Sequence, residues 1–169
     1  LAAISGANLA TLHTAQIAAL TTVQLEALST AQLGNLNTDQ IKALTTAQLA
    51  AIETADFTAI ETVDLAALGT AAVRALSDSQ LAALGSDQFA AFTTLQVGAF
   101  STAQIAALAS DDLNALTTAQ FAALTTSQVA ALSTLQVSTL ATEDLASLGT
   151  AAIRALGTAD LVALDSVQF

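Results

Sequence analysis

Apolar and polar positions follow one another along this chain with a period of eight, from Ser5 to Leu164. In each eight-residue repeat, or octad, the fifth position is always Leu, Ile, Val or Phe, and the eighth is always Leu, Ile or Phe. The twenty complete octads contain no insertion or deletion, and a fixed period of this kind sets the whole fold. We therefore treat residues 1–169 as a single continuous octapeptide-repeat array with partial ends, and expect it to be a fragment of a longer repeat protein.

The eight-residue period predicts short helices. In one long helix the two apolar positions would rotate by about 80° per octad, so they would form no continuous face. In a strand the two positions would point to opposite faces, because they are an odd number of residues apart. We expect an all-α fold, a solenoid or superhelix of short N-capped helices, one per octad. Because helices of about two turns are unstable alone, they must stack on one another, and we expect two octads in each coil.

The second position, or column two, holds only Thr, Ser, Asp or Gly, the residues preferred at a helix N-cap. An alternative stays open, in which the cap lies one residue earlier and forms a capping box, as Thr21 would with Gln24. The predicted structural helix caps are Thr22, Thr30, Thr38, Thr46, Thr54, Thr62, Thr70, Thr94, Thr102, Thr118 and Thr126.

Columns five and eight supply the predicted core. Its representative residues are Leu25, Leu28, Leu49, Ile52, Phe57, Phe89 and Phe121. Column four, mostly Gln or Asp, lies beside these columns on a helix, at the margin of the apolar face. A buried amide without a partner is costly, so we expect this side chain to bond main-chain groups at its own or the adjacent helix start.

Composition and charge exclude several classes of protein. Fourteen Asp and Glu against three Lys and Arg give a net charge of −11, which repels nucleic acid. No stretch approaches the roughly 18 apolar residues of a spanning helix, so we expect no membrane insertion. The chain has no Cys and therefore no disulfide or thiolate site.

Few residues suggest chemistry. His13 is the only His and has no cluster of metal ligands around it in the sequence. Asp111 and Asp112 fit acids at a helix start better than a calcium loop, which also needs a characteristic spacing. Arg74 and Arg154, which recur eighty residues apart, suit a solvated face better than an anion site. We expect no catalytic residue, no metal and no cofactor.

The octads "STAQIAAL" at residues 101–108 and "TTAQFAAL" at residues 117–124 resemble the Thr/Ala/Gln-rich octapeptide arrays of very large secreted bacterial surface proteins, many of them adhesin-like. The resemblance implies an extracellular or cell-surface location and a role as a long spacer or filament segment. It brings no catalytic residue with it.

These observations favour a non-catalytic structural repeat protein, a rigid acidic spacer or a filament-forming subunit that self-associates end to end. One alternative is a partner-binding α-solenoid module that uses the surface of the superhelix. A more distant alternative is ice binding through the regular Thr residues, which requires that their hydroxyls are not occupied as caps.

Overall fold

The computed structural model describes residues 6–168; residues 1–5 and Phe169, which belong to the partial octads and to the first position of the first complete one, lie outside the described residues. This part of the chain forms helices of four to six residues, one per octad, and contains no strand. The helices are α1 (Gly6–Leu9), α2 (Thr14–Ala18), α3 (Thr22–Glu26), α4 (Thr30–Leu33), α5 (Thr38–Ala43), α6 (Thr46–Ala51), α7 (Thr54–Phe57), α8 (Thr62–Ala67), α9 (Thr70–Arg74), α10 (Asp78–Ala82), α11 (Ser86–Ala91), α12 (Thr94–Ala99), α13 (Thr102–Ala107), α14 (Ser110–Asn114), α15 (Thr118–Ala122), α16 (Thr126–Val129), α17 (Thr134–Ser138), α18 (Thr142–Ser147), α19 (Thr150–Ile153) and α20 (Thr158–Ala163).

Extended residues at the ends of the octads join one helix to the next. Between α6 and α7, Ile52 has φ −64° and ψ 129°, and Glu53 has φ −62° and ψ 142°. No described residue has a positive φ, so the bends need no left-handed conformation. This explains how a chain without Pro and with only seven Gly can turn at every octad.

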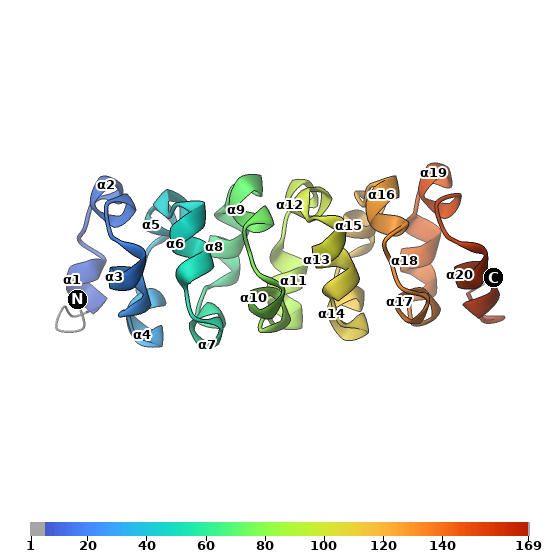
Figure 1. Ribbon diagram of the computed structural model, residues 1–169, viewed down its shortest axis with the longest axis horizontal. Coiled ribbons are helices and arrows are strands. Elements are labelled where there is room, and N and C mark those ends of the chain that lie inside the picture. The colour runs from blue at the N-terminus through green and yellow to red at the C-terminus, as the bar shows by residue number, and fades with distance from the viewer. Residues whose placement is uncertain (1–5, 169) are drawn as a thin grey trace.

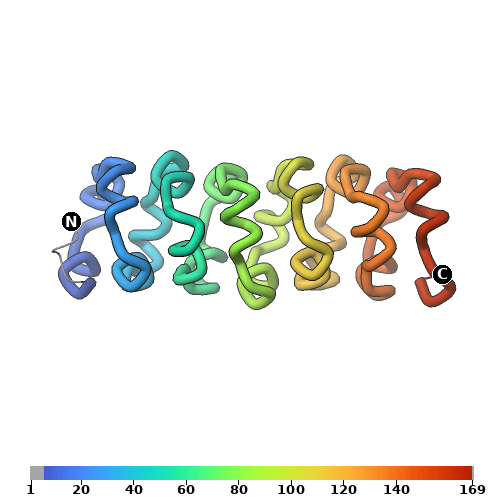
Figure 2. The backbone as a smooth tube through the Cα atoms, turned by 60° about the horizontal axis from the view of Figure 1, so that its bottom comes forward, coloured from blue at the N-terminus to red at the C-terminus, as the bar shows by residue number. Residues whose placement is uncertain are grey.

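The helices wind into a solenoid with the two ends of the chain at opposite ends of the molecule (Figure 1). Each helix packs on the helix three octads along, as α2 does on α5, α3 on α6 and α8 on α11. Hydrogen bonds from column four reach the octad four places earlier, so one coil takes between three and four octads. The repeated coils are visible in the tube of Figure 2.

The expectation of two octads per coil is therefore wrong. The number of helices per coil is set by the direction of each bend, which depends on the φ and ψ of the linking residues. The apolar columns do not encode that direction, so they could not predict the number. With helices packed about 8–10 Å apart, the twenty octads form about six coils and a rod of roughly 55 Å.

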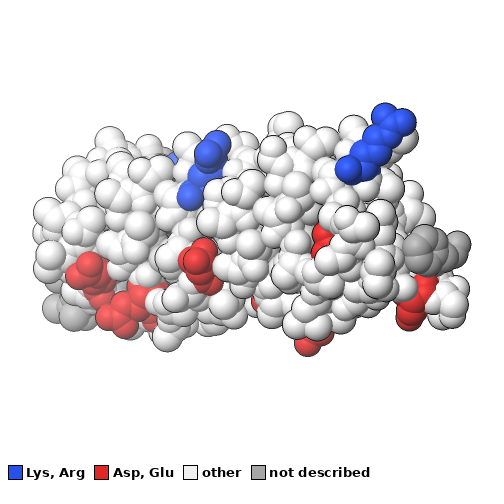
Figure 3. All heavy atoms as spheres, turned by 45° about the vertical axis from the view of Figure 1, so that its right-hand side comes forward, with Lys and Arg blue, Asp and Glu red and all other residues white. Residues whose placement is uncertain are grey.

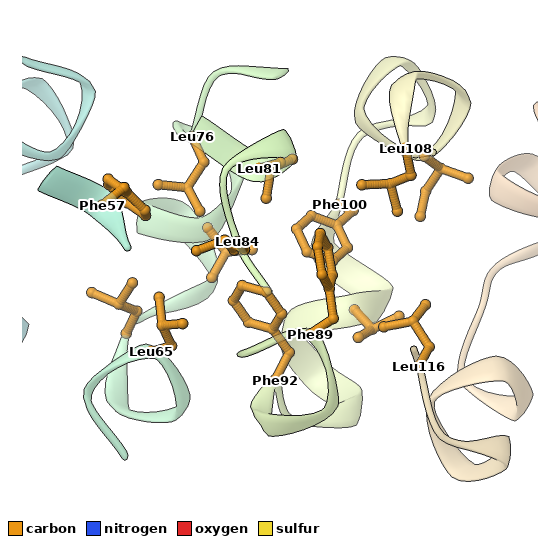
Figure 4. Packing of buried hydrophobic residues seen from close by; sticks show 14 of the residues in the cluster. Phe57, Leu65, Leu76, Leu81, Leu84, Phe89, Phe92, Phe100, Leu108 and Leu116 are labelled. Carbon is orange, nitrogen blue, oxygen red and sulfur yellow. The ribbon is translucent and has the colours of Figure 1, made fainter. Parts of the chain in front are cut away.

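The side chains of columns five and eight form one continuous core along the axis, from Leu9 to Leu156. Phe89 packs edge-on against Phe92 with centroids 6.1 Å apart, and Phe92 against Phe100 at 5.3 Å (Figure 4). Leu84 and other aliphatic side chains of the core lie beside them in the same view. The all-α solenoid of short helices is confirmed, and its stability comes from this shared core because no single helix is long enough to persist alone.

None of the helices in residues 6–168 combines the length and the apolar character needed to cross a bilayer.

Candidate functional site

The helix caps lie one residue earlier than predicted. Thr22 and the other column-two threonines named above are the first helical residues, and the N-cap is column one, with extended backbone such as φ −74° and ψ 158° at Thr21. The Thr21 hydroxyl accepts the N–H of Gln24, and the Thr21 N–H donates to Gln24 Oε1 at 2.9 Å. The alternative capping box is thus the correct one, because Gln three residues after the cap completes it only when the cap is in column one.

The predicted core residues all lie inside the solenoid. Leu25, Leu28, Leu49, Ile52, Phe57, Phe89 and Phe121 are each exposed by 5% or less. Burying a side chain of this size contributes about 1.5–3 kcal/mol, so these two columns supply most of the favourable free energy of folding.

The column-four glutamines bind one coil to the next. In Gln80, Oε1 accepts the Ser77 N–H at 3.0 Å, while Nε2 donates to the carbonyls of Leu49 and Ile52, both at 2.9 Å. Those carbonyls belong to columns five and eight of the octad four places earlier. We call this arrangement the glutamine clasp. Its other members with both carbonyl bonds are Gln40, Gln48, Gln96, Gln104, Gln120, Gln128, Gln136 and Gln168.

The clasp solves a hydrogen-bonding problem specific to very short helices. A helix of four to six residues leaves most of its carbonyls without an intrahelical donor, and those that face the next coil are shielded from water. The Gln amide donates to both carbonyls there and uses its oxygen at its own helix start; the column-five carbonyl also accepts the column-eight N–H of its own octad, as Ile17 does from Leu20 at 3.1 Å. The predicted bond to the helix's own start is present; the second partner is the end of a helix in the neighbouring coil, not the start of an adjacent one.

Where column four is Asp, the bonds differ. Thr30 Oγ1 donates to the Asp56 carboxylate, and Thr134 Oγ1 donates to Asp160 Oδ1 at 2.8 Å, in both cases across three octads. Asp64 is 5% exposed, and its buried Oδ1 has no hydrogen-bond partner among the described residues. Burial raises the pKa of the Asp144 carboxyl above its usual range, and the neighbouring Glu143 carboxylate adds to the rise.

The remaining sequence candidates do not gather into a site. His13 is exposed at the start of α2, and its N–H donates to Gln16 Oε1 at 2.9 Å. Asp111 is exposed and Asp112 half-buried in the first turn of α14; burial raises the pKa of Asp112, against a main-chain hydrogen bond at Ala109 that lowers it. Within residues 6–168, no group of three His, Asp or Glu side chains could hold a metal ion.

The exposed Arg74 borders a shallow, open groove between α9 and α12, beside Leu95 and Gly98. The guanidinium makes no ion pair with a described acid. Arg154, its counterpart eighty residues on, is also exposed on α19. Both cations thus lie on the outside of the solenoid, as the solvated face expected from the sequence requires.

Searches against curated proteins and against solved structures found no match. The sequence profile of the ALTTAQ repeat matches four segments of the chain, residues 22–54, 57–94, 105–142 and 137–169, which together cover most of it. Each segment is longer than one coil, so the profile spans helices that pack on one another. The chain therefore belongs to the ALTTAQ repeat family and is a tandem array of its repeats.

Proposed function

We propose that this chain is a non-catalytic structural protein, a rigid acidic spacer or filament-forming subunit on a bacterial cell surface. The observations that carry the proposal are the continuous core and the recurrence of the same glutamine clasp near both ends of the rod. Gln40 near one end bonds Leu9 and Leu12, and Gln136 near the other bonds Ile105 and Leu108, with all four bonds between 2.8 and 2.9 Å. A core and a clasp that recur from coil to coil give length and stiffness, and the described residues present no cluster of polar groups around an enclosed pocket.

The charge distribution suits a spacer that must not aggregate side by side with other rods. The net charge is −11, and acidic side chains spread along the lower part of the face in Figure 3, with basic side chains on its upper part. Mutual repulsion between such rods opposes side-by-side aggregation at low salt.

Stiffness is tested by distance measurement between two spin or fluorescent labels. The chain has no Cys, so Glu26→Cys in α3 and Val162→Cys in α20 give two labelling sites, both exposed. A rigid spacer gives one narrow distance distribution that stays the same when salt is raised. A broad distribution, like that of a flexible linker, would contradict the proposal.

The surface location needs its own test. An antibody against the array, applied to intact producing cells, should label them without permeabilisation. Labelling that appears only after the cells are opened would remove the surface part of the proposal and leave the spacer part standing.

The exposed column-two threonines favour one alternative, ice binding. Thr46, Thr94 and Thr118 are exposed and do not cap their helices, so the objection that their hydroxyls are occupied does not hold. Column-two hydroxyls three octads apart, such as those of Thr94 and Thr118, lie about 8–10 Å apart, which is sparse for a flat array. An ice-recrystallisation assay decides this: crystal growth unaffected by the protein excludes the alternative.

A further inference from the structure

We propose that a proton completes the clasp where column four holds an Asp that is shielded from water, so that the solenoid gains links between its coils as the pH falls. The residues concerned are Asp64, Asp112 and Asp144. In acid, each donates its carboxyl O–H to a main-chain carbonyl of the octad four places earlier, as a clasp glutamine donates its amide. The proposal goes beyond the spacer role and does not depend on it.

The register of the chain puts these three aspartates in the position of a clasp glutamine. Gln80 donates to two carbonyls that lie 31 and 28 residues earlier. The same separations lead back from the three aspartates to three pairs of carbonyls, those of Leu33 and Leu36 for Asp64, Leu81 and Leu84 for Asp112, and Leu113 and Leu116 for Asp144. Each Asp is therefore placed where a glutamine would bind the earlier coil.

One carbonyl of each pair needs a donor. The column-five carbonyl accepts the column-eight N–H of its own octad, as Leu81 does from Leu84 at 3.0 Å. The column-eight carbonyls of Leu36, Leu84 and Leu116 accept no hydrogen bond from residues 6–168. These three residues are only 3–4% exposed, so water has little access to them. A shielded carbonyl without a donor is costly, and each of the three is an acceptor that a clasp would satisfy.

The carboxyls also lack partners. Asp64 is 5% exposed and its buried Oδ1 has no partner, and Asp144 is 4% exposed with no described donor to its carboxyl. Asp112 accepts the main-chain N–H of Ala109, just as a clasp glutamine accepts the N–H of its own helix start. An ionised carboxylate has no hydrogen to donate, whereas a protonated carboxyl has one. Protonation therefore supplies one donor, and the column-eight carbonyl is the partner that lacks one.

The surroundings favour the protonated form. Charged side chains occur beside the three aspartates, on the helices packed against α8, α14 and α18, on the helices that carry the three carbonyl pairs, and in the turn after α20. They are Asp39, Lys42, Glu61, Asp78, Asp87, Asp111, Glu143 and Asp165. Only Lys42 is basic; it is exposed and makes no ion pair with Asp64 in the described part of the chain. Burial raises the pKa of Asp112, against the hydrogen bond from Ala109 that lowers it, and burial together with the Glu143 carboxylate raises the pKa of Asp144.

Acid should therefore stabilise this rod. Because the pKa values of Asp112 and Asp144 are raised in the folded chain, the folded state binds these protons more tightly than the unfolded state. Their contribution is fully present below the unfolded pKa of 3.8 and is lost as the pH rises through the folded values. Urea denaturation between pH 7 and pH 4 should show the unfolding equilibrium constant falling by roughly threefold for each link that forms.

Replacing the three aspartates by Asn separates the clasps from the general loss of negative charge. Asn has the shape of the protonated carboxyl and a permanent donor, so Asp64→Asn with Asp112→Asn and Asp144→Asn should be more stable than wild type at pH 7 and vary less with pH. The matched control replaces the exposed Asp39, Asp78 and Asp87 by Asn and should keep the wild-type dependence on pH. Equal pH dependence in the two triple variants overturns the proposal.

Carbon-13 NMR identifies the acceptor. In the wild type, the main-chain carbonyl signals of Leu84 and Leu116 should move with the same midpoints as the carboxyl signals of Asp112 and Asp144, which lie 28 residues later. In the Asn triple variant the two carbonyl signals should stay constant over the same pH range. If they stay constant in the wild type while the carboxyls titrate, water bonds these carbonyls in place of the carboxyl, and the proposal is overturned.

Discussion

Two neighbouring segments of the solenoid, residues 53–76 and residues 77–108, bury the same core with different polar chemistry. In residues 77–108, which form α10 to α13, column four is Gln in every octad, and each of these glutamines donates to a main-chain carbonyl of an earlier coil. In residues 53–76, which form α7 to α9, column four holds Asp56, Asp64 and Ala72. None of these side chains can make the clasp, because none has an amide donor.

This difference in polar residues does not change the burial of the apolar columns. Phe57, Leu65 and Val73 of the first segment are fully buried, as are Phe89, Val97 and Ile105 of the second. Burial is therefore set by columns five and eight, and the clasp adds stability without shaping the core.

Column one also differs between the two segments, apart from one Gly in each, Gly69 and Gly85. Ser77, Thr93 and Ser101 accompany Gln, whereas Glu53 and Glu61 accompany Asp. The Ser and Thr hydroxyls complete reciprocal capping boxes with Gln, and the helices that begin after Glu53 and Glu61 have no side-chain cap. We infer that the first segment has the lower local stability.

The largest expected effect is in the core and should be the same in both segments. Leu65→Ala and Leu81→Ala each remove a buried side chain, and each should lower the free energy of unfolding by about 2–5 kcal/mol. Urea denaturation of the two variants measures it. A loss in one segment many times that in the other would contradict a shared, continuous core.

The second-largest effect is expected when a glutamine clasp is removed. Gln96→Ala removes the donor to Leu65 and Leu68, at 2.7 and 2.8 Å, and should cost about 2–3 kcal/mol because the shielded Leu68 carbonyl loses its donor and the Leu65 carbonyl keeps only the Leu68 N–H. The control is Gln24→Ala, which removes the same side chain where it makes only its helix-start bonds, and should cost about 1 kcal/mol or less. Equal costs at the two positions would show that the carbonyl bonds add nothing.

Removing a hydroxyl at the helix start should lower the free energy of unfolding by less than the clasp variant does, and only when the hydroxyl is in column one. Thr93→Ala removes the hydroxyl that accepts the Gln96 N–H and should cost about 1 kcal/mol. Thr94→Ala changes an exposed first helical residue and should lie within about 0.5 kcal/mol of wild type. Thermal unfolding of the two variants measures both losses of stability. A larger loss for Thr94→Ala than for Thr93→Ala would contradict our assignment of the N-cap to column one.

The smallest effect is pH-dependent and concerns the Asp octads. Because burial, with Glu143, raises the pKa of Asp144 in the folded chain, the folded state binds its proton more tightly than the unfolded state does. Stability from this group is therefore fully present below its unfolded pKa of 3.8 and is lost as the pH rises through the folded value.

Asp144→Asn should accordingly stabilise the chain slightly at pH 7 and lose that advantage near pH 3, as measured by urea denaturation at both values. Asp87→Asn, at an exposed position, controls for the change in net charge. An advantage for Asp144→Asn that grows as the pH falls would contradict the sign.

The sequence predicted the helices and the core because each depends on neighbours within one octad. It left the cap position open, since Thr and Ser occur in both column one and column two; the pairing of Ser77 with Gln80 and of Glu61 with Asp64 was the signal that could have decided it.

The coil could not be predicted in the same way. The number of octads per coil depends on small rotations at linking residues such as Ile52 and Glu53, and these add up over three or four helices. Without that number, the partner of a clasp glutamine four octads away is unknown, so the main polar contact between coils was missed.

A designed disulfide tests the three-to-four-octad coil most directly. Thr134 and Asp160 hydrogen-bond at 2.8 Å across three octads, and the native chain has no Cys to compete. Under mild oxidation, Thr134→Cys with Asp160→Cys should form an intramolecular disulfide that non-reducing mass spectrometry detects, while Thr134→Cys with Thr150→Cys, two octads apart, should not. Cross-linking of the two-octad pair in place of the other would contradict the coil described above.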